Sequence, residues 1–120
     1  AVSLISAIYN DKNEIHTVNV HNNGGIVDLS EDVVVELNAV IGKSGARPIA
    51  SGKLPIQING LIQAVKSYEL LAVDAGISGD YNTALMSLMS NPLVPSIKVA
   101  KKILDDILMA NVDYLPQFNK

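Results

Sequence analysis

The sequence predicts an α+β fold in which a small antiparallel sheet is packed by about four helices. Between residues 14 and 41, apolar residues alternate with polar ones, which is the spacing of strands. In the first nine residues and again after Pro55, apolar residues recur every three or four positions, which is the spacing of helices. Strands and helices do not alternate along the chain, so the pattern excludes a Rossmann fold.

The amino-terminal half is predicted to supply the sheet. A helix is expected over residues 1–9, and a strand over residues 14–20 with His16, Val18 and Val20 on one face. A second strand is expected over residues 32–41, with these side chains facing the core: Val33, Val35, Leu37, Ala39 and Ile41. Residues 21–25 form a loop in which adjacent glycines permit positive φ, and residues 42–48 form a second connection.

The carboxy-terminal half is predicted to be helical. Over residues 58–77, one apolar stripe is expected to face a core: Leu61, Ile62, Val65, Tyr68, Ala72 and Ala75. Small residues near its end, Ala75 and Gly76 among them, would let another backbone approach closely, and Gly79 is placed to stop the helix. Asp80 and Ser96 are predicted to cap two further helices, which end before Pro92 and at Pro116. We expect these three helices to cover one face of the sheet around a single core.

Composition narrows the class of protein. The chain has 120 residues and a formal net charge of −3, so a general nucleic-acid binder is disfavoured, as is attachment to a membrane surface. No apolar run reaches the roughly 20 residues that span a bilayer, and no signal peptide is evident, so we expect a soluble cytoplasmic protein. The absence of Cys excludes disulfides, thiolate ligands and a Cys nucleophile within these residues. The first helix starts abruptly at Ala1, which suggests a segment of a longer polypeptide or a processed precursor.

Few residues of this chain are candidates for catalysis or for binding a cofactor or metal. Neither spacing of a phosphate-binding glycine loop occurs, and the serines lack an elbow motif. His16 and His21 should point to opposite faces of one strand, and an inward-facing or interface-packed histidine is the ordinary interpretation of each. His21 is the better functional candidate because it borders the glycine loop. Glu36 is interpreted as a surface or salt-bridged residue, and the adjacent carboxylates at 105 and 106 as a solvated helix face.

The segment order nevertheless resembles the family 4 glycoside hydrolases. That family carries a strand, then Asn-x-Gly-x-Ile-x-x-Leu-Pro and Asp-x-x-Val-Glu, and the chain matches at Asn22, Gly24, Ile26, Leu29, Asp32, Val35 and Glu36. Ser30 stands where the family has proline. The resemblance continues through residues 45–49, Leu54-Pro55, residues 73–80, residues 91–94 and residues 114–116. Residues 4–11 and 91–95 look most like the 6-phospho-β-glucosidase branch, with the 6-phospho-α-glucosidase branch as the alternative.

The resemblance implies that residues 1–120 are the carboxy-terminal domain of such an enzyme, with a lactate-dehydrogenase carboxy-terminal-like fold. Enzymes of this family use NAD and a divalent metal, usually manganese, to hydrolyse 6-phosphoglucosides by oxidation, elimination and addition. The resemblance places the NAD-binding Rossmann domain, the metal-binding Cys and His and the tyrosine base in a preceding segment of the polypeptide. No catalytic, cofactor-binding or metal-binding residue is therefore expected in this chain, which should be inactive alone.

What the resemblance leaves to this chain is a supporting role. We expect a substrate-proximal loop that comprises His21, Asn22, Asn23 and Gly24. The Asn22 amide could bind a substrate hydroxyl or fix the loop through its own backbone, and the sequence does not choose between these roles. The expected partners are the amino-terminal Rossmann domain, the 6-phosphoglucoside and further copies in a homo-oligomer. The competing interpretation is a non-catalytic binding or oligomerisation module that shares this fold.

Overall fold

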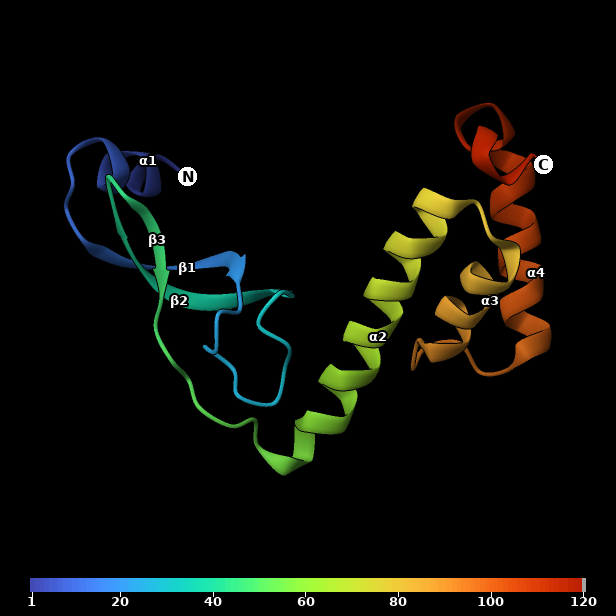
Figure 1. Ribbon diagram of the computed structural model, residues 1–120, viewed down its shortest axis with the longest axis horizontal. Coiled ribbons are helices and arrows are strands. Elements are labelled where there is room, and N and C mark those ends of the chain that lie inside the picture. The colour runs from blue at the N-terminus through green and yellow to red at the C-terminus, as the bar shows by residue number, and fades with distance from the viewer. Residues whose placement is uncertain (120) are drawn as a thin grey trace. The chain divides into compact units, whose positions relative to one another are not determined.

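The computed structural model describes residues 1–119, which form two compact units. The first unit runs from Ala1 to Ile56 and the second begins at Gln57. Together they contain a three-stranded antiparallel sheet and four α-helices (Figure 1). The predicted α+β class is therefore confirmed. The prediction of a single core is wrong, because each unit encloses its own cluster of buried side chains.

The first unit contains helix α1 (Val2–Tyr9) and strands β1 (Glu14–His21), β2 (Val34–Gly42) and β3 (Gly45–Pro48). The strands pair in the order β1-β2-β3, so β2 is central. Val18 lies opposite Leu37 in the register of β1 with β2. Residues 45–48, expected to be a connection, instead form β3, a strand too short to show a period of its own that is held by its pairing with β2.

Alternation along β2 gives the first unit its core. Every second side chain from Val33 to Ile41 is buried, as predicted, while Glu36 and Asn38 point to the exposed face. Helix α1 covers the buried face: Ala7 packs with Ala39 and Ile41, and Leu4 and Val18 flank this cluster. The covered face of β2 is thus apolar, as expected for an antiparallel sheet with one covered side, whereas the other face is mixed, because Ile15 and Val34 are exposed there beside polar residues.

The second unit contains α3 (Tyr81–Ser90), α4 (Ile97–Ala110), two short 3-10 helices (Val112–Tyr114 and Pro116–Phe118) and nearly all of α2 (Ile56–Ser78). The predicted caps are confirmed, since Asp80 accepts from the Thr83 amide and Ser96 from the Val99 amide. α4 ends at Ala110 rather than at Pro116, because the chain tightens into the 3-10 helix Val112–Tyr114 before the proline.

Three helices build the second core. Ala75 of α2, Ala84 of α3 and Leu104 of α4 form its buried centre. The predicted stripe on α2 is only partly buried: Leu61 and Val65 are exposed, because they lie towards the amino-terminal end of α2, before the segment from Tyr68 to Gly76 that borders α3 and α4. The expectation that these helices cover the sheet remains a prediction. No helix among residues 1–119 is long and apolar enough to cross a membrane.

Candidate functional site

Asn22 organises the loop that the sequence singles out. It follows β1 directly and its side chain is completely buried. Its Nδ2 group donates to the backbone carbonyls of Ile26 (2.9 Å), Leu29 (3.0 Å) and Ser30 (3.0 Å). Its Oδ1 atom accepts from the Ile26 amide at 2.7 Å. The carboxamide has two N–H donors, and both are engaged, so it has no donor left for a substrate hydroxyl. Of its two predicted roles, the geometry supports fixing the loop.

A tight turn lies at the tip of this loop. The Gly25 amide donates to the Asn22 carbonyl at 2.7 Å, and the two residues between them have positive φ: +43° at Asn23 and +79° at Gly24. Two such residues in succession are typical of a type I′ turn, which favours Asn followed by Gly. Asn23 and Gly24 are exposed, so they are the part of the loop that another molecule can reach.

Gly25 has a different role. A Cβ atom added there would lie 2.5 Å from Leu37 Cδ1 and 3.0 Å from the Asn22 carbonyl oxygen. A side chain at this buried glycine would therefore force Leu37 and the turn backbone to shift. An added Cβ at Gly24 would meet no heavy atom within 4 Å. The two adjacent glycines thus serve different needs, close packing at Gly25 and backbone conformation at Gly24.

The loop is tied to a second segment of the same unit. The Ser51 amide donates to the Gly25 carbonyl at 2.7 Å, and the Val27 amide donates to the Gly52 carbonyl at 3.0 Å. The Asp28 carboxylate accepts from the Leu54 amide at 2.7 Å. With Ile26 and Leu29 buried beneath it, the loop is a fixed platform with an exposed tip.

The two histidines lie on opposite faces of β1, as predicted. His16 is on the half-buried face, and its Nε2 lies 3.4 Å from Glu14 Oε2 without hydrogen-bond geometry. His21 is exposed at the end of the strand beside the loop, so an inward orientation is wrong for it. The histidines are therefore separated by the sheet and cannot form one site.

The carboxylates behave as surface groups. Glu36 is exposed opposite Asn19 in the register. Asp105 accepts a hydrogen bond from the Tyr81 hydroxyl at 2.7 Å, whereas Asp106 lies 3.4 Å from Lys102 Nζ. The Asp105 bond raises the pKa of Tyr81. Within residues 1–119, no group of three His, Asp or Glu side chains could hold a metal ion.

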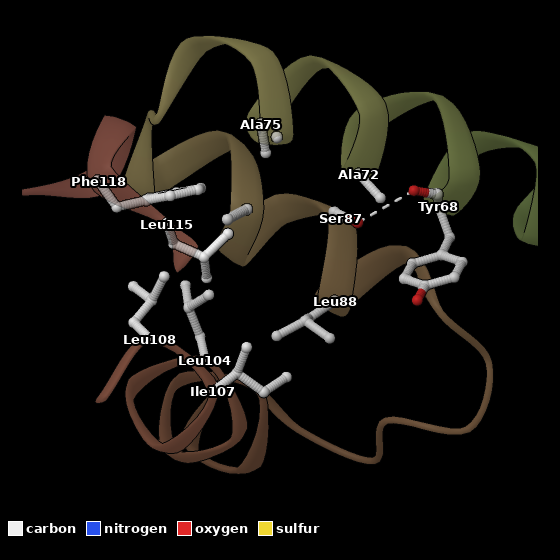
Figure 2. Close-up of a pocket in the computed structure, with 12 residues that line it drawn as sticks. Tyr68, Ala72, Ala75, Ser87, Leu88, Leu104, Ile107, Leu108, Leu115 and Phe118 are labelled. Carbon is white, nitrogen blue, oxygen red and sulfur yellow. Dashed lines mark hydrogen bonds between the residues drawn. The ribbon is translucent and has the colours of Figure 1, made fainter. Parts of the chain in front are cut away.

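A pocket of about 210 Å³ lies inside the second unit, between α2, α3, α4 and the carboxy-terminal residues Leu115 and Phe118 (Figure 2). Its wall is mostly aliphatic, and the small residues Ala72, Ala75 and Gly76 form the α2 side. Ser87 donates to the Tyr68 carbonyl at 3.0 Å. No carboxylate or imidazole lines the pocket, so it lacks groups for acid–base catalysis. The sequence indicated close approach at these small residues, but it did not indicate a pocket.

The profile of the family 4 glycosyl hydrolase C-terminal domain matches residues 1–94. The chain therefore belongs to the family 4 glycosyl hydrolases. Its segment is the C-terminal domain of that family, as the loop sequence predicted.

The relatives include both β- and α-specific phosphoglucosidases. A probable 6-phospho-beta-glucosidase of Bacillus subtilis is 52% identical over 118 residues, which are 98% of this chain and 27% of that protein. A phospho-alpha-glucosidase of Clostridium acetobutylicum is 38% identical over 113 residues, which are 94% of this chain and 25% of that protein. The chain thus spans about a quarter of the length of these relatives.

Solved structures share the fold. A 6-phospho-alpha-glucosidase from gut microorganisms, in complex with NAD and glucose-6-phosphate, matches with a TM-score of 0.92 and 37% identity over 97% of this chain and 26% of that one. The 6-phospho-beta glucosidase of Thermotoga maritima, with manganese, NAD+ and glucose-6-phosphate, matches with a TM-score of 0.86 and 35% identity over 94% of this chain and 28% of that one.

Proposed function

We propose that the chain is the C-terminal part of an NAD- and divalent-metal-dependent 6-phospho-β-glucosidase. The observation that carries the β specificity is the 52% identity to the Bacillus subtilis relative, against 38% to the phospho-alpha-glucosidase of Clostridium acetobutylicum. The complete enzyme would hydrolyse O-glycosidic bonds of 6-phosphoglucosides in carbohydrate metabolism, acting as a homo-oligomer.

The described residues do not fit NAD or manganese. They contain no group of three metal-ligating side chains, and the sequence has neither Cys nor a phosphate-binding glycine loop. We therefore assign both groups to an amino-terminal part of the polypeptide that carries a Rossmann domain. The fragment is expected to be inactive alone, with no catalytic residue of its own.

The proposed contribution of this chain is the loop tip. Asn22 fixes the loop from within, while His21, Asn23 and Gly24 are exposed. The Asn23 amide can donate to and accept from sugar hydroxyls, and the His21 imidazole can do the same. Because Asn22 holds the backbone in one conformation, these groups would meet the substrate without the cost of ordering the loop backbone.

The reaction is tested on the complete polypeptide with p-nitrophenyl 6-phospho-β- and 6-phospho-α-glucosides. We expect hydrolysis of the β anomer that needs both NAD and manganese. A preference for the α anomer would contradict the proposed specificity. Absence of hydrolysis of either anomer, with both cofactors present, would favour the non-catalytic module.

The loop is tested separately with Asn23→Gly, which removes the amide but keeps a residue that accepts positive φ. We expect KM for the phosphoglucoside to rise at least tenfold, equivalent to about 1.4 kcal/mol of lost binding. Asn13→Gly is the matched control, because Asn13 also has positive φ (+56°) but lies at the other end of β1. Equal KM values in both variants would rule out the substrate contact.

A further inference from the structure

Helix α2 carries apolar side chains on two nearly opposite faces. One face includes Tyr68, Ala72 and Ala75, which line the pocket shared with α3 and α4. The other includes Leu70, Val73 and Ile77, which we call the outer stripe. At 3.6 residues per turn, the centres of the two faces are about 165° apart. The helices that cover the first face therefore cannot also cover the second.

The outer stripe is exposed. Leu70 is 49% exposed, Val73 59% and Ile77 78%. Their spacing of three and four residues is that of anchors with which an amphipathic helix docks into an apolar surface. A helix that is apolar on most sides is normally buried in a larger protein. The outer stripe thus has the character of a contact surface.

We propose that the outer stripe packs against the part of the polypeptide that lies outside residues 1–120. This inference rests on the proposed function only in treating the chain as part of a longer enzyme. The relatives are about four times as long as the segment they share with this chain, which leaves ample sequence to cover α2. The partner surface is apolar, and it accepts three side chains in a row along about one and a half to two helical turns.

The size of the stripe favours this occupant over a second copy. A stable contact between separate proteins buries about 800 Å² on each partner and involves 20–30 residues. The outer stripe supplies three large side chains, which is far fewer. Covalent linkage in one chain raises the effective concentration to about millimolar or more, so a small apolar contact suffices.

Photocrosslinking of the complete polypeptide tests the proposal. The photoreactive residue p-benzoylphenylalanine replaces Val73 in one variant and the exposed Lys101 of α4 in a control variant. Each variant is mixed with an isotope-labelled copy, irradiated and mapped by mass spectrometry. We expect Val73 to crosslink within its own chain to a peptide outside residues 1–120, with a yield at least tenfold above that of Lys101.

Each other outcome contradicts the proposal: a crosslink to residues 1–56, a crosslink to the isotope-labelled copy, or a yield equal to that of Lys101. Val73→Cys provides a milder substitution if the bulky group prevents folding. The rate at which maleimide modifies each variant is corrected for its rate with the unsubstituted polypeptide. The Val73→Cys thiol should then react at least tenfold more slowly than the Lys101→Cys thiol. Equal rates would again contradict the proposed packing of the outer stripe. Crosslinks are read without substrate, so a polypeptide that crosslinks as expected but hydrolyses no phosphoglucoside would refute only the proposed function.

Discussion

Asn22 shapes its loop through four hydrogen bonds from a single buried carboxamide. The partners are backbone groups of residues 26–30. The Ile26 and Ser30 carbonyls also accept from the Leu29 and Val33 amides, whereas the Ile26 amide and the Leu29 carbonyl depend on Asn22. An unpartnered buried polar group costs about 1–3 kcal/mol. The side chain therefore stands in for the regular backbone pairing that a loop lacks.

We expect Asn22→Ala to lower the free energy of unfolding by roughly 3 kcal/mol, because the Ile26 amide and the Leu29 carbonyl lose their partner. Asn22→Asp should cost at least as much, since a carboxylate cannot donate to the three carbonyls. Urea denaturation measures both values. Asn19→Ala, on the exposed face of β1, is the control and should stay within about 0.5 kcal/mol of the parent. A loss at Asn22 no larger than this would show that the hydrogen bonds are not needed.

The Asp80 cap is expected to make the stability of the protein depend on pH. Hydrogen bonds from the Thr83 hydroxyl (2.7 Å) and amide (2.6 Å) hold the pKa of Asp80 below its usual value. A lowered pKa in the folded state means that the ionised cap stabilises α3 above the pKa of the unfolded chain. This stabilisation is lost as pH falls through the lower folded value.

We therefore expect Asp80→Ala to have a lower Tm than the parent at pH 7, with the difference shrinking below about pH 4. Asp80→Asn is the matched control, because its amide oxygen caps the helix but does not titrate in this range. Thermal unfolding from pH 2 to pH 7 measures all three proteins. A difference between the parent and Asp80→Ala that stays constant over this range would contradict the assignment.

At the scale of elements, the junction of α2 with α3 depends on Gly79. This residue has φ of +71°, and an added Cβ would overlap the backbone carbonyl of Gln117. The Gln117 side chain also donates to the Gly76 carbonyl at 2.8 Å, so the carboxy-terminal segment lies directly on the end of α2. Backbone conformation and close packing together require glycine there.

We expect Gly79→Ala to destabilise the protein by about 3 kcal/mol or more, since overpacking adds about 1–3 kcal/mol to the cost of positive φ. Gly45→Ala is the matched control, because Gly45 also has positive φ (+97°) but open space around its Cα. It should lose only about 1–2 kcal/mol. Chemical denaturation compares the two, and equal losses would mean that the carboxy-terminal segment moves away at no cost.

At the scale of the whole molecule, residues 1–119 hold a shaped loop but no group of three His, Asp or Glu side chains that could hold a metal ion. The chain spans about a quarter of each relative, so the proposed activity belongs to a larger polypeptide. The proposed contribution, a loop presented to a site built elsewhere in the polypeptide, requires a fixed backbone conformation rather than reactive groups.

If the cofactor sites lie outside this chain, as proposed, NAD and manganese should stabilise only the complete polypeptide. NAD and manganese, added at millimolar concentration, should raise the Tm of the complete polypeptide, because binding to the folded state stabilises it. They should leave the Tm of the 120-residue chain unchanged to within about 1 °C, provided that the chain melts cooperatively. Thermal shift measurements make the comparison. A shift in the 120-residue chain would mean that it contributes a binding site of its own.

The sequence by itself determined the helices, two of the three strands and the helix caps, since these follow from local periodicity and short-range hydrogen bonding. Val33 to Ile41 alternate, and Asp80 and Ser96 stand at the first turns they cap. The loop was also identified in the sequence, through its glycines and its family resemblance.

Only the tertiary structure decided which way the Asn22 side chain points and what it binds. An Asn side chain can point towards solvent or inward, and the choice at Asn22 depends on carbonyls brought beneath it by the burial of Ile26 and Leu29. β3 and the separate second core likewise depend on pairing and packing between distant residues. Local patterns carry no information on such contacts, because their energies arise only when the chain has folded.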